Sequence, residues 1–297
     1  MQAEAGSTLF ARIFIDAPVT LAAWAYYILA FVVAFAPFYL AACLCPCRKL
    51  AFQYLNHLYC RGFFAQLRLL APRQHWQIDP RLDTSRGAVV LCNHLSYLDP
   101  LLLMAAMRRS ATVVKARFFH LPIFGWVLKS AGYLPSSTEG GFAALMLKQM
   151  EGLKSYLAEG GNLFIFPEGT RSRNGAPLPL QHGSLKLARL SKAPLLVFRI
   201  SNTNILFPPG RFLFNASRAN SIRVDFVAAI QPQDAIYQGP LGELEAHLRS
   251  LLADTPQENQ HHSPPPPNTC IRFIRHHRLH HEHPAPIHAR YHPGCCP

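Results

Sequence analysis

The sequence predicts an α/β fold in which a central, mostly parallel sheet is flanked by helices. Short apolar runs rich in β-branched residues alternate with segments of helical periodicity, the pattern of a chain that alternates strands and helices. Several runs are apolar throughout, as in strands buried on both faces. The strands are expected at 75–78, 88–92, 111–114, 162–166, 195–200 and 222–230. The helices are expected at 101–107, 140–158, 184–190 and 241–252.

Composition favours a protein that binds phosphate at a membrane. The 297 residues suffice for one sizeable domain with additional segments. Half of them are hydrophobic, and the formal charge is +13 with a pI of about 9.7. A basic surface attracts nucleic acid or lipid headgroups, and the apolar N-terminus favours lipid, so no nucleic-acid partner is expected. The eight cysteines cluster without disulfide spacings, which indicates reduced thiols in a cytosolic setting.

The N-terminal region predicts membrane association. After a mixed arm over residues 1–16, no charged residue occurs from Ala17 to Cys47, which exceeds the roughly 20 residues that span a bilayer. Arg48 and Lys49 follow, and positive residues favour the cytoplasmic side. Whether the segment crosses the membrane or re-enters as a hairpin kinked at Pro37 stays open.

The helical pattern continues from Leu50 to Leu70, either in the membrane interface or as an ordinary domain helix. Residues 17–71 are therefore expected to form membrane-associated helices. The box Leu40 to Cys43 resembles a lipoprotein cleavage site, but the preceding apolar segment is long for a signal peptide and lacks a strongly basic start.

Residues 87–100, GAVVLCNHLSYLDP, organise the rest of the chain. A buried strand ends at Asn93-His94, and Asp99-Pro100 predicts a helix start with Asp99 at or near the N-cap and Pro100 at N1. A carboxylate in that position can hold one imidazole nitrogen of His94 and leave the other free as a base. The alternative is a loop histidine beside a helix-capping aspartate.

Residues 164–174, FIFPEGTRSRN, form the second block. An apolar strand runs into a glycine-containing turn followed by Arg171 and Arg173. Such a turn presents backbone N–H groups and guanidinium groups to an anion.

Together, Asn93-His94-x4-Asp99 and Phe166-Pro167-Glu168-Gly169-Thr170-Arg171-Ser172 resemble the glycerolipid acyltransferase family, whose best-known members are the 1-acylglycerol-3-phosphate acyltransferases. The resemblance runs from about Arg73 to Ile230. It implies an O-acyltransferase that moves a fatty acyl group from acyl-CoA or acyl carrier protein to the free hydroxyl of a lysophospholipid. The expected acceptor is 1-acylglycerol-3-phosphate and the expected product phosphatidic acid.

The resemblance implies a role for each site residue. His94 is the base and Asp99 its orienter, whereas the other residues bind substrate or shape the loop. This second group comprises Asn93, Ser96, Lys115, Glu168, Gly169, Thr170 and Arg171. No metal or cofactor is expected, because proton transfer suffices and the acyl donor is a co-substrate.

The chain departs from the family pattern at several positions. Thr138 stands where the family has an arginine thought to hold the acceptor's phosphate, Gln181 where it has lysine, and Arg117 where it has glutamate. The first two departures keep another acceptor open, either a different lysophospholipid or an amino-acid lysolipid. A non-catalytic membrane or metal-binding protein is the alternative of another class, which the intact His94, Asp99, Glu168 and Arg171 disfavour.

The domain boundaries follow from these segments. The acyltransferase domain is expected over residues 72–254, with its active site at the membrane on the cytoplasmic side. From residue 255 the chain is rich in proline and histidine and shows no periodicity, which predicts a disordered tail over residues 255–297.

Overall fold

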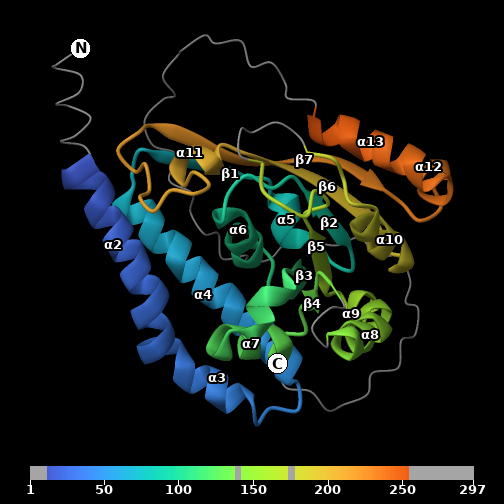
Figure 1. Ribbon diagram of the computed structural model, residues 1–297, viewed down its shortest axis with the longest axis horizontal. Helices are drawn as coiled ribbons and strands as arrows, with labels where there is room; N and C mark the ends of the chain where they lie inside the picture. The colour runs from blue at the N-terminus through green and yellow to red at the C-terminus, as the bar shows by residue number, and fades with distance from the viewer. Residues whose placement is uncertain (1–11, 138–141, 173–177, 254–297) are drawn as a thin grey trace, which may run out of the picture. The chain divides into compact units, whose positions relative to one another are not determined.

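The computed structural model describes residues 12–137, 142–172 and 178–253 (Figure 1). Most of the expected N-terminal arm, Thr138 and the expected tail over 255–297 lie outside these ranges.

The described residues form a seven-stranded sheet, which confirms the predicted α/β class. In spatial order the strands are β1 (Gln74–Ile78), β7 (Asn220–Ile230), β6 (Leu195–Ser201), β2 (Val89–Cys92), β5 (Asn162–Ile165), β3 (Ser110–Val114) and β4 (Leu134–Pro135). All neighbouring pairs are parallel except β6 and β7. The central strand β2 therefore lies between two parallel neighbours, β6 and β5, so the three carboxyl ends meet at one edge.

Two hydrophobic cores form because successive side chains of a strand point to opposite faces of the sheet. In β2, Val89 and Leu91 join one core, and Val90 and Cys92 join the other. The first core is covered by α7 (Pro122–Ser130), α8 (Ala143–Glu151), α9 (Leu153–Ala158), α10 (His182–Leu190) and α13 (Leu241–Ala253). The second is covered by α5 (Pro80–Thr84), α6 (Leu98–Ala106) and α11 (Thr203–Leu206). The short elements η3 (Ala116–His120) and α12 (Ala235–Gln238) complete the domain.

The helix expected over residues 140–158 is instead two helices, α8 and α9, that meet at Gly152. Glycine is a poor helix former because its unfolded backbone has more freedom to lose. The heptad-like apolar spacing continues across the break, so hydrophobic periodicity alone predicted one helix.

The N-terminal apolar segment is a continuous helix over Ile13–Ala42. It consists of η1 (Arg12–Asp16), α2 (Ala17–Ala25), η2 (Tyr26–Phe35) and α3 (Ala36–Ala42). Pro37 does not reverse the chain, because it lies in the first turn of α3 after the wider π-helical turns of η2. The reversal comes after Ala42, and α4 (Arg48–Leu70) returns beside the first helix (Figure 1).

Hydrogen bonds join this helix to α4 along their length. Tyr26 Oη donates to the Tyr59 carbonyl at 3.0 Å, and Gln66 Nε2 donates to the Ala22 carbonyl at 3.0 Å. Near the turn, Tyr39 Oη donates to Asn56 Oδ1 at 2.6 Å. The helix is long and apolar enough to cross a bilayer, judged by its length and composition. One face of this helix nonetheless packs against the rest of the protein.

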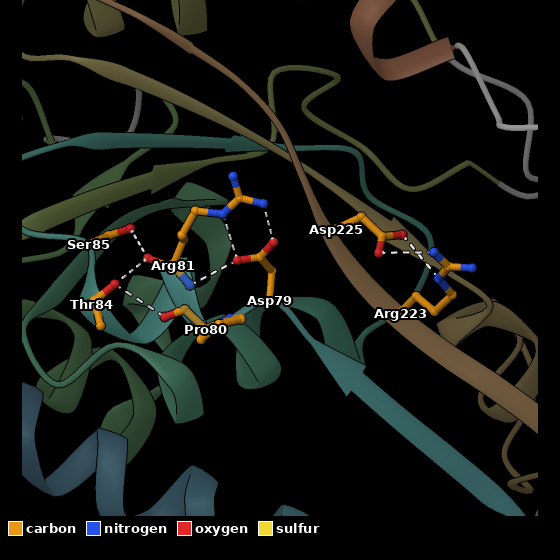
Figure 2. A network of polar contacts seen from close by, with 7 residues as sticks. All are labelled: Asp79, Pro80, Arg81, Thr84, Ser85, Arg223 and Asp225. Atoms are coloured by element: carbon orange, nitrogen blue, oxygen red, sulfur yellow. Dashed lines mark hydrogen bonds and ion pairs between the residues drawn. The ribbon is translucent and has the colours of Figure 1, made fainter. Parts of the chain in front are cut away.

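Two surface ion pairs lie near the β1 edge of the sheet (Figure 2). Asp79 caps α5 by accepting from the Arg81 backbone N–H at 2.9 Å, and its carboxylate pairs with the Arg81 guanidinium. Arg223 and Asp225 pair within β7. These charges lie beside β1 and β7, whereas the two sequence motifs follow β2 and β5.

Candidate active site

Asn93 fixes the point at which the chain leaves the central strand. Its side-chain amide donates to the Ile200 carbonyl at 2.8 Å and accepts from the Ile200 N–H at 2.7 Å. The side chain thus continues the pairing of β2 with β6 by one further residue. This geometry accords with a role in shaping the loop, since both polar ends of the amide are occupied by β6.

His94 and Asp99 form a hydrogen-bonded pair at the carboxyl edge of β2. The distance from His94 Nδ1 to Asp99 Oδ2 is 2.9 Å, and the same oxygen accepts from the backbone N–H groups of Leu95 and Ser96 at 2.6 and 2.7 Å. Asp99 is fully buried, whereas the His94 side chain retains 16% exposure. An imidazole that donates through Nδ1 keeps its lone pair on Nε2, which can accept a proton.

The helix of this block begins two residues earlier than predicted. α6 starts at Leu98 with Tyr97 as its N-cap, so Asp99 and Pro100 are its second and third residues. Pro100 is tolerated there because the first-turn N–H groups have no partner within the helix. Asp99 lies inside the helix start, where its carboxylate reaches back to the loop that carries His94.

Two further contacts hold this loop. The imidazole of His94 stacks on Phe166, with ring centroids 4.2 Å apart and planes at 20°. The buried Ser96 hydroxyl donates to the Phe207 carbonyl at 2.8 Å. Ser96 therefore contacts the protein rather than the open side of the site.

The turn after β5 requires glycine at position 169. Gly169 has a φ of +65°, and a Cβ there would lie 2.2 Å from Gln181 Nε2. Its N–H donates to the Phe166 carbonyl at 3.0 Å, and the Ser172 N–H donates to the His94 carbonyl at 2.8 Å. The two sequence motifs are thus joined through their backbones.

Glu168 is buried inside this junction, with 3% of its surface exposed. The backbone N–H groups of His94 and Leu178 donate to its carboxylate. Burial, and to a smaller extent the nearby Asp99 charge, nevertheless raise the pKa of Glu168 to about 7 against the effect of the two hydrogen bonds. The structure places Glu168 among protein groups, and its predicted contact with substrate stays a prediction.

Glu168→Gln is expected to make stability less sensitive to pH. The folded-state pKa of about 7 lies above the ordinary value of 4.5, so the folded protein binds more protons than the unfolded chain between these values and stability falls as pH rises through them. Glutamine removes this loss, which is at most about 3 kcal/mol for a shift of this size. Denaturant unfolding at pH 5 and pH 8 measures this difference in the free energy of unfolding. An equal decline in the free energy of unfolding of both proteins would contradict the burial of Glu168.

Arg171 is a cation of this turn. Its guanidinium carbon lies 3.4 Å from the centroid of the Tyr97 ring. Its Nη1 is buried and has no hydrogen-bond acceptor among the described residues. Thr170 is exposed beside it, and the exposed Lys115 follows β3, whose carboxyl end lies next to that of β5. The arrangement brings a base and two cationic side chains to one edge of the sheet, and within the described ranges neither cation forms an ion pair.

Sequence reasoning missed three aromatic residues of this region. Phe166 supports the His94 ring, Tyr97 lies under Arg171, and Phe207 accepts the hydrogen bond from Ser96. Phe166 and Tyr97 stand inside the two motifs and could have been noted there. Phe207 lies in a separate segment, and no pattern in the sequence connects it with the site.

Comparisons with known proteins indicate the family that this chain resembles. Residues 75–201 match the family model described as Acyltransferase. A 1-acyl-sn-glycerol-3-phosphate acyltransferase of Saccharomyces cerevisiae is 27% identical over 175 residues, which cover 57% of this chain and 55% of that protein. A chloroplastic enzyme of the same name from Brassica napus is 28% identical over 134 residues, 44% of this chain and 37% of that protein. The chain therefore spans about half or less of the length of these two relatives.

A solved structure shares the fold. The 1-acyl-sn-glycerophosphate acyltransferase PlsC of Thermotoga maritima superposes with a TM-score of 0.62 at 20% identity, covering 82% of this chain and 95% of that one. At this identity the likeness concerns the fold, including the mostly parallel sheet. These comparisons confirm the resemblance inferred from the two motifs, and residues 75–201 are the part of the chain that is similar to the Acyltransferase family model.

Proposed function

We propose that this chain transfers a fatty acyl group from a thioester donor to the free hydroxyl of a lysophospholipid, with 1-acylglycerol-3-phosphate as the acceptor. The observation that carries the proposal is the His94–Asp99 pair at the edge of β2, joined through the Ser172 N–H to the turn that carries Arg171. A base and a phosphate-binding cation on adjoining loops are what an acyl transfer to a phosphorylated alcohol requires.

His94 acts as the general base. Its Nε2 takes the proton of the acceptor hydroxyl while the oxygen attacks the thioester carbonyl carbon. The Asp99 carboxylate holds the imidazole by Nδ1 and stabilises the imidazolium that forms. Collapse of the tetrahedral intermediate breaks the carbon–sulfur bond, and the departing thiolate receives the proton from His94. The acyl group ends on the acceptor oxygen, and no protein nucleophile is needed.

Arg171 binds the acceptor's phosphate in this proposal. A buried guanidinium N–H without an acceptor is a strong donor for a phosphate oxygen. Lys115 and the exposed Thr170 add donors at the same edge. Phosphate on the acceptor and on acyl-CoA or acyl carrier protein also suits the formal charge of +13.

The exposed face of the N-terminal helix is proposed to lie against the membrane, which would bring the site to its lipid acceptor on the cytoplasmic side. Val19, Ala23 and Tyr39 are buried against the domain. The opposite face exposes large apolar side chains, namely Leu21, Ile28, Leu29, Val32, Val33 and Phe38. A helix with one face bound along the domain and the other apolar and exposed suits an interfacial position.

Leu29→Asp with Val33→Asp is expected to release the protein from vesicles without unfolding it. These side chains are 59% and 74% exposed, so the change leaves the core intact. Aspartate is disfavoured by about 2.5–3.5 kcal/mol at the bilayer centre, and a smaller interfacial penalty for two residues still lowers partitioning at least about tenfold. Co-sedimentation with phosphatidylcholine–phosphatidylglycerol vesicles measures it. Leu147→Asp with Leu190→Asp, at 61% and 58% exposure, is the matched control; equal release by both pairs would contradict the assigned face.

The acceptor is tested by comparing initial rates on lysophosphatidate, lysophosphatidylcholine, an ornithine lysolipid and monoacylglycerol with one labelled acyl-CoA. Lysophosphatidate is expected to give the highest kcat/KM. A preference for the ornithine lysolipid or for monoacylglycerol would show that the acceptor carries no phosphate, and the transfer chemistry would still stand.

A further inference from the structure

Tyr97 supports the guanidinium of Arg171. The guanidinium carbon lies 3.4 Å from the ring centroid, a face-on contact in which the cation is attracted to the π-system. Arg171 Nη1 has no hydrogen-bond acceptor among the described residues. The ring is therefore the main contact that orients the guanidinium before an anion arrives.

Two contacts with Phe207 fix the position of Tyr97. Its ring packs on Phe207 with centroids 6.2 Å apart, and Phe207 stacks on Phe214 at 4.4 Å. Its neighbour Ser96 donates to the Phe207 carbonyl at 2.8 Å. The Tyr97 hydroxyl makes no hydrogen bond within the described part of the chain, so the contact that matters is made by the face of the ring.

The segment behind Tyr97 also meets the N-terminal helix. Trp24 packs on Phe207 with centroids 6.3 Å apart, and the Phe214 N–H donates to the Thr20 hydroxyl at 2.9 Å. The guanidinium is thus connected, through Tyr97 and Phe207, to the helix that carries the exposed apolar face.

We propose that Tyr97 is a positioning residue, whose ring holds Arg171 in the orientation that directs Nη1 at the phosphate of the lipid acceptor. The inference rests on the proposed function, because it takes a phosphate as the ligand of Arg171. Tyr97 remains 47% exposed. The competing explanation is that Tyr97 is simply an apolar surface contact, and the two explanations differ in what a change at Tyr97 does to KM.

Tyr97→Leu is expected to raise KM for lysophosphatidate about 3- to 30-fold, the range that corresponds to measured cation–π strengths. The value of kcat should change little, because His94 and Asp99 are untouched. Tyr97→Phe keeps the ring face and is expected to restore the KM of the unmodified protein. Tyr54→Leu, which removes a ring of 48% exposure on α4, is the matched control. Circular dichroism melts identify any variant that fails to fold.

A double variant separates orientation from general damage. Tyr97→Leu is expected to add nothing to the KM of Arg171→Ala, because no guanidinium is left to orient. The inference is overturned if Tyr97→Leu raises KM equally in the Arg171→Ala background. It is also overturned if Tyr97→Phe behaves like Tyr97→Leu, because the hydroxyl would then carry the effect.

Binding gives a readout that needs no turnover. Calorimetry of lysophosphatidate on the His94→Ala protein is expected to show Kd raised by Tyr97→Leu by the same factor as KM. If lysophosphatidate binds in a Tyr97-dependent way but the unmodified protein transfers no acyl group, the proposed function is refuted and the inference about Tyr97 stands. Transfer with KM and Kd unchanged by Tyr97→Leu would refute the inference alone.

Discussion

His94→Ala is expected to lower the rate of acyl transfer by about 10²–10⁴-fold, the usual contribution of a general base. The acceptor hydroxyl would then lose its proton only to water. The loss should fall on kcat, because the acceptor is held by Arg171 and its neighbours rather than by the imidazole. Steady-state kinetics with lysophosphatidate and labelled acyl-CoA measure it.

His75→Ala is the matched control. His75 is exposed on β1, an edge strand of the sheet, and β7 and β6 separate it from β2. Both variants should keep the melting temperature of the unmodified protein, since His94 contributes one stacked ring and one hydrogen bond at a loop. Activity of His94→Ala within a few-fold of the unmodified protein would refute the assignment of the base.

Asp99→Asn is expected to reduce kcat by about 10²-fold or more, the scale of a lost general base, for a reason specific to this geometry. One oxygen of Asp99 accepts three hydrogen bonds, and the other has no donor among the described residues. If the asparagine oxygen keeps the three bonds, the amide NH₂ is buried without an acceptor and the charge that stabilises the imidazolium is gone. If the amide is reversed, its NH₂ faces two backbone N–H groups and forces the other tautomer on His94.

The melting temperature and the split between kcat and KM distinguish Asp99→Asn from simple unfolding. Loss of the carboxylate removes the charge that stabilises the imidazolium in the transition state, so kcat should fall while KM for lysophosphatidate stays close to that of the unmodified protein. A variant that melts normally and retains the kcat of the unmodified protein would show that Asp99 only caps the loop.

The strands and the His94–Asp99 pair could be predicted from the sequence because both depend on residues close together along the chain. Apolar runs bounded by turns identify buried strands, and only four residues separate the histidine from its carboxylate. The same holds for Gly169, where a tight turn requires positive φ.

Other features depend on segments that meet only in the folded chain. The amide of Asn93 pairs with Ile200 and the hydroxyl of Ser96 donates to Phe207, and neither partner can be identified from the motif alone. The support of Arg171 by Tyr97 needs two loops from different strands. The position of the chain reversal, after Ala42, could not be predicted for a different reason. A proline in the first turn of a helical segment does not end that segment, so the proline here does not mark the reversal.

The account is tested most directly by identifying the product formed from one labelled acyl-CoA and lysophosphatidate by the purified protein in phospholipid vesicles. Mass spectrometry is expected to find the label in phosphatidic acid, with one free thiol released for each acyl group transferred, and His94→Ala should abolish both signals together. Thiol release with the label in free fatty acid would show that water is the acceptor. That result, or formation of phosphatidic acid at an undiminished rate by His94→Ala, would contradict the account.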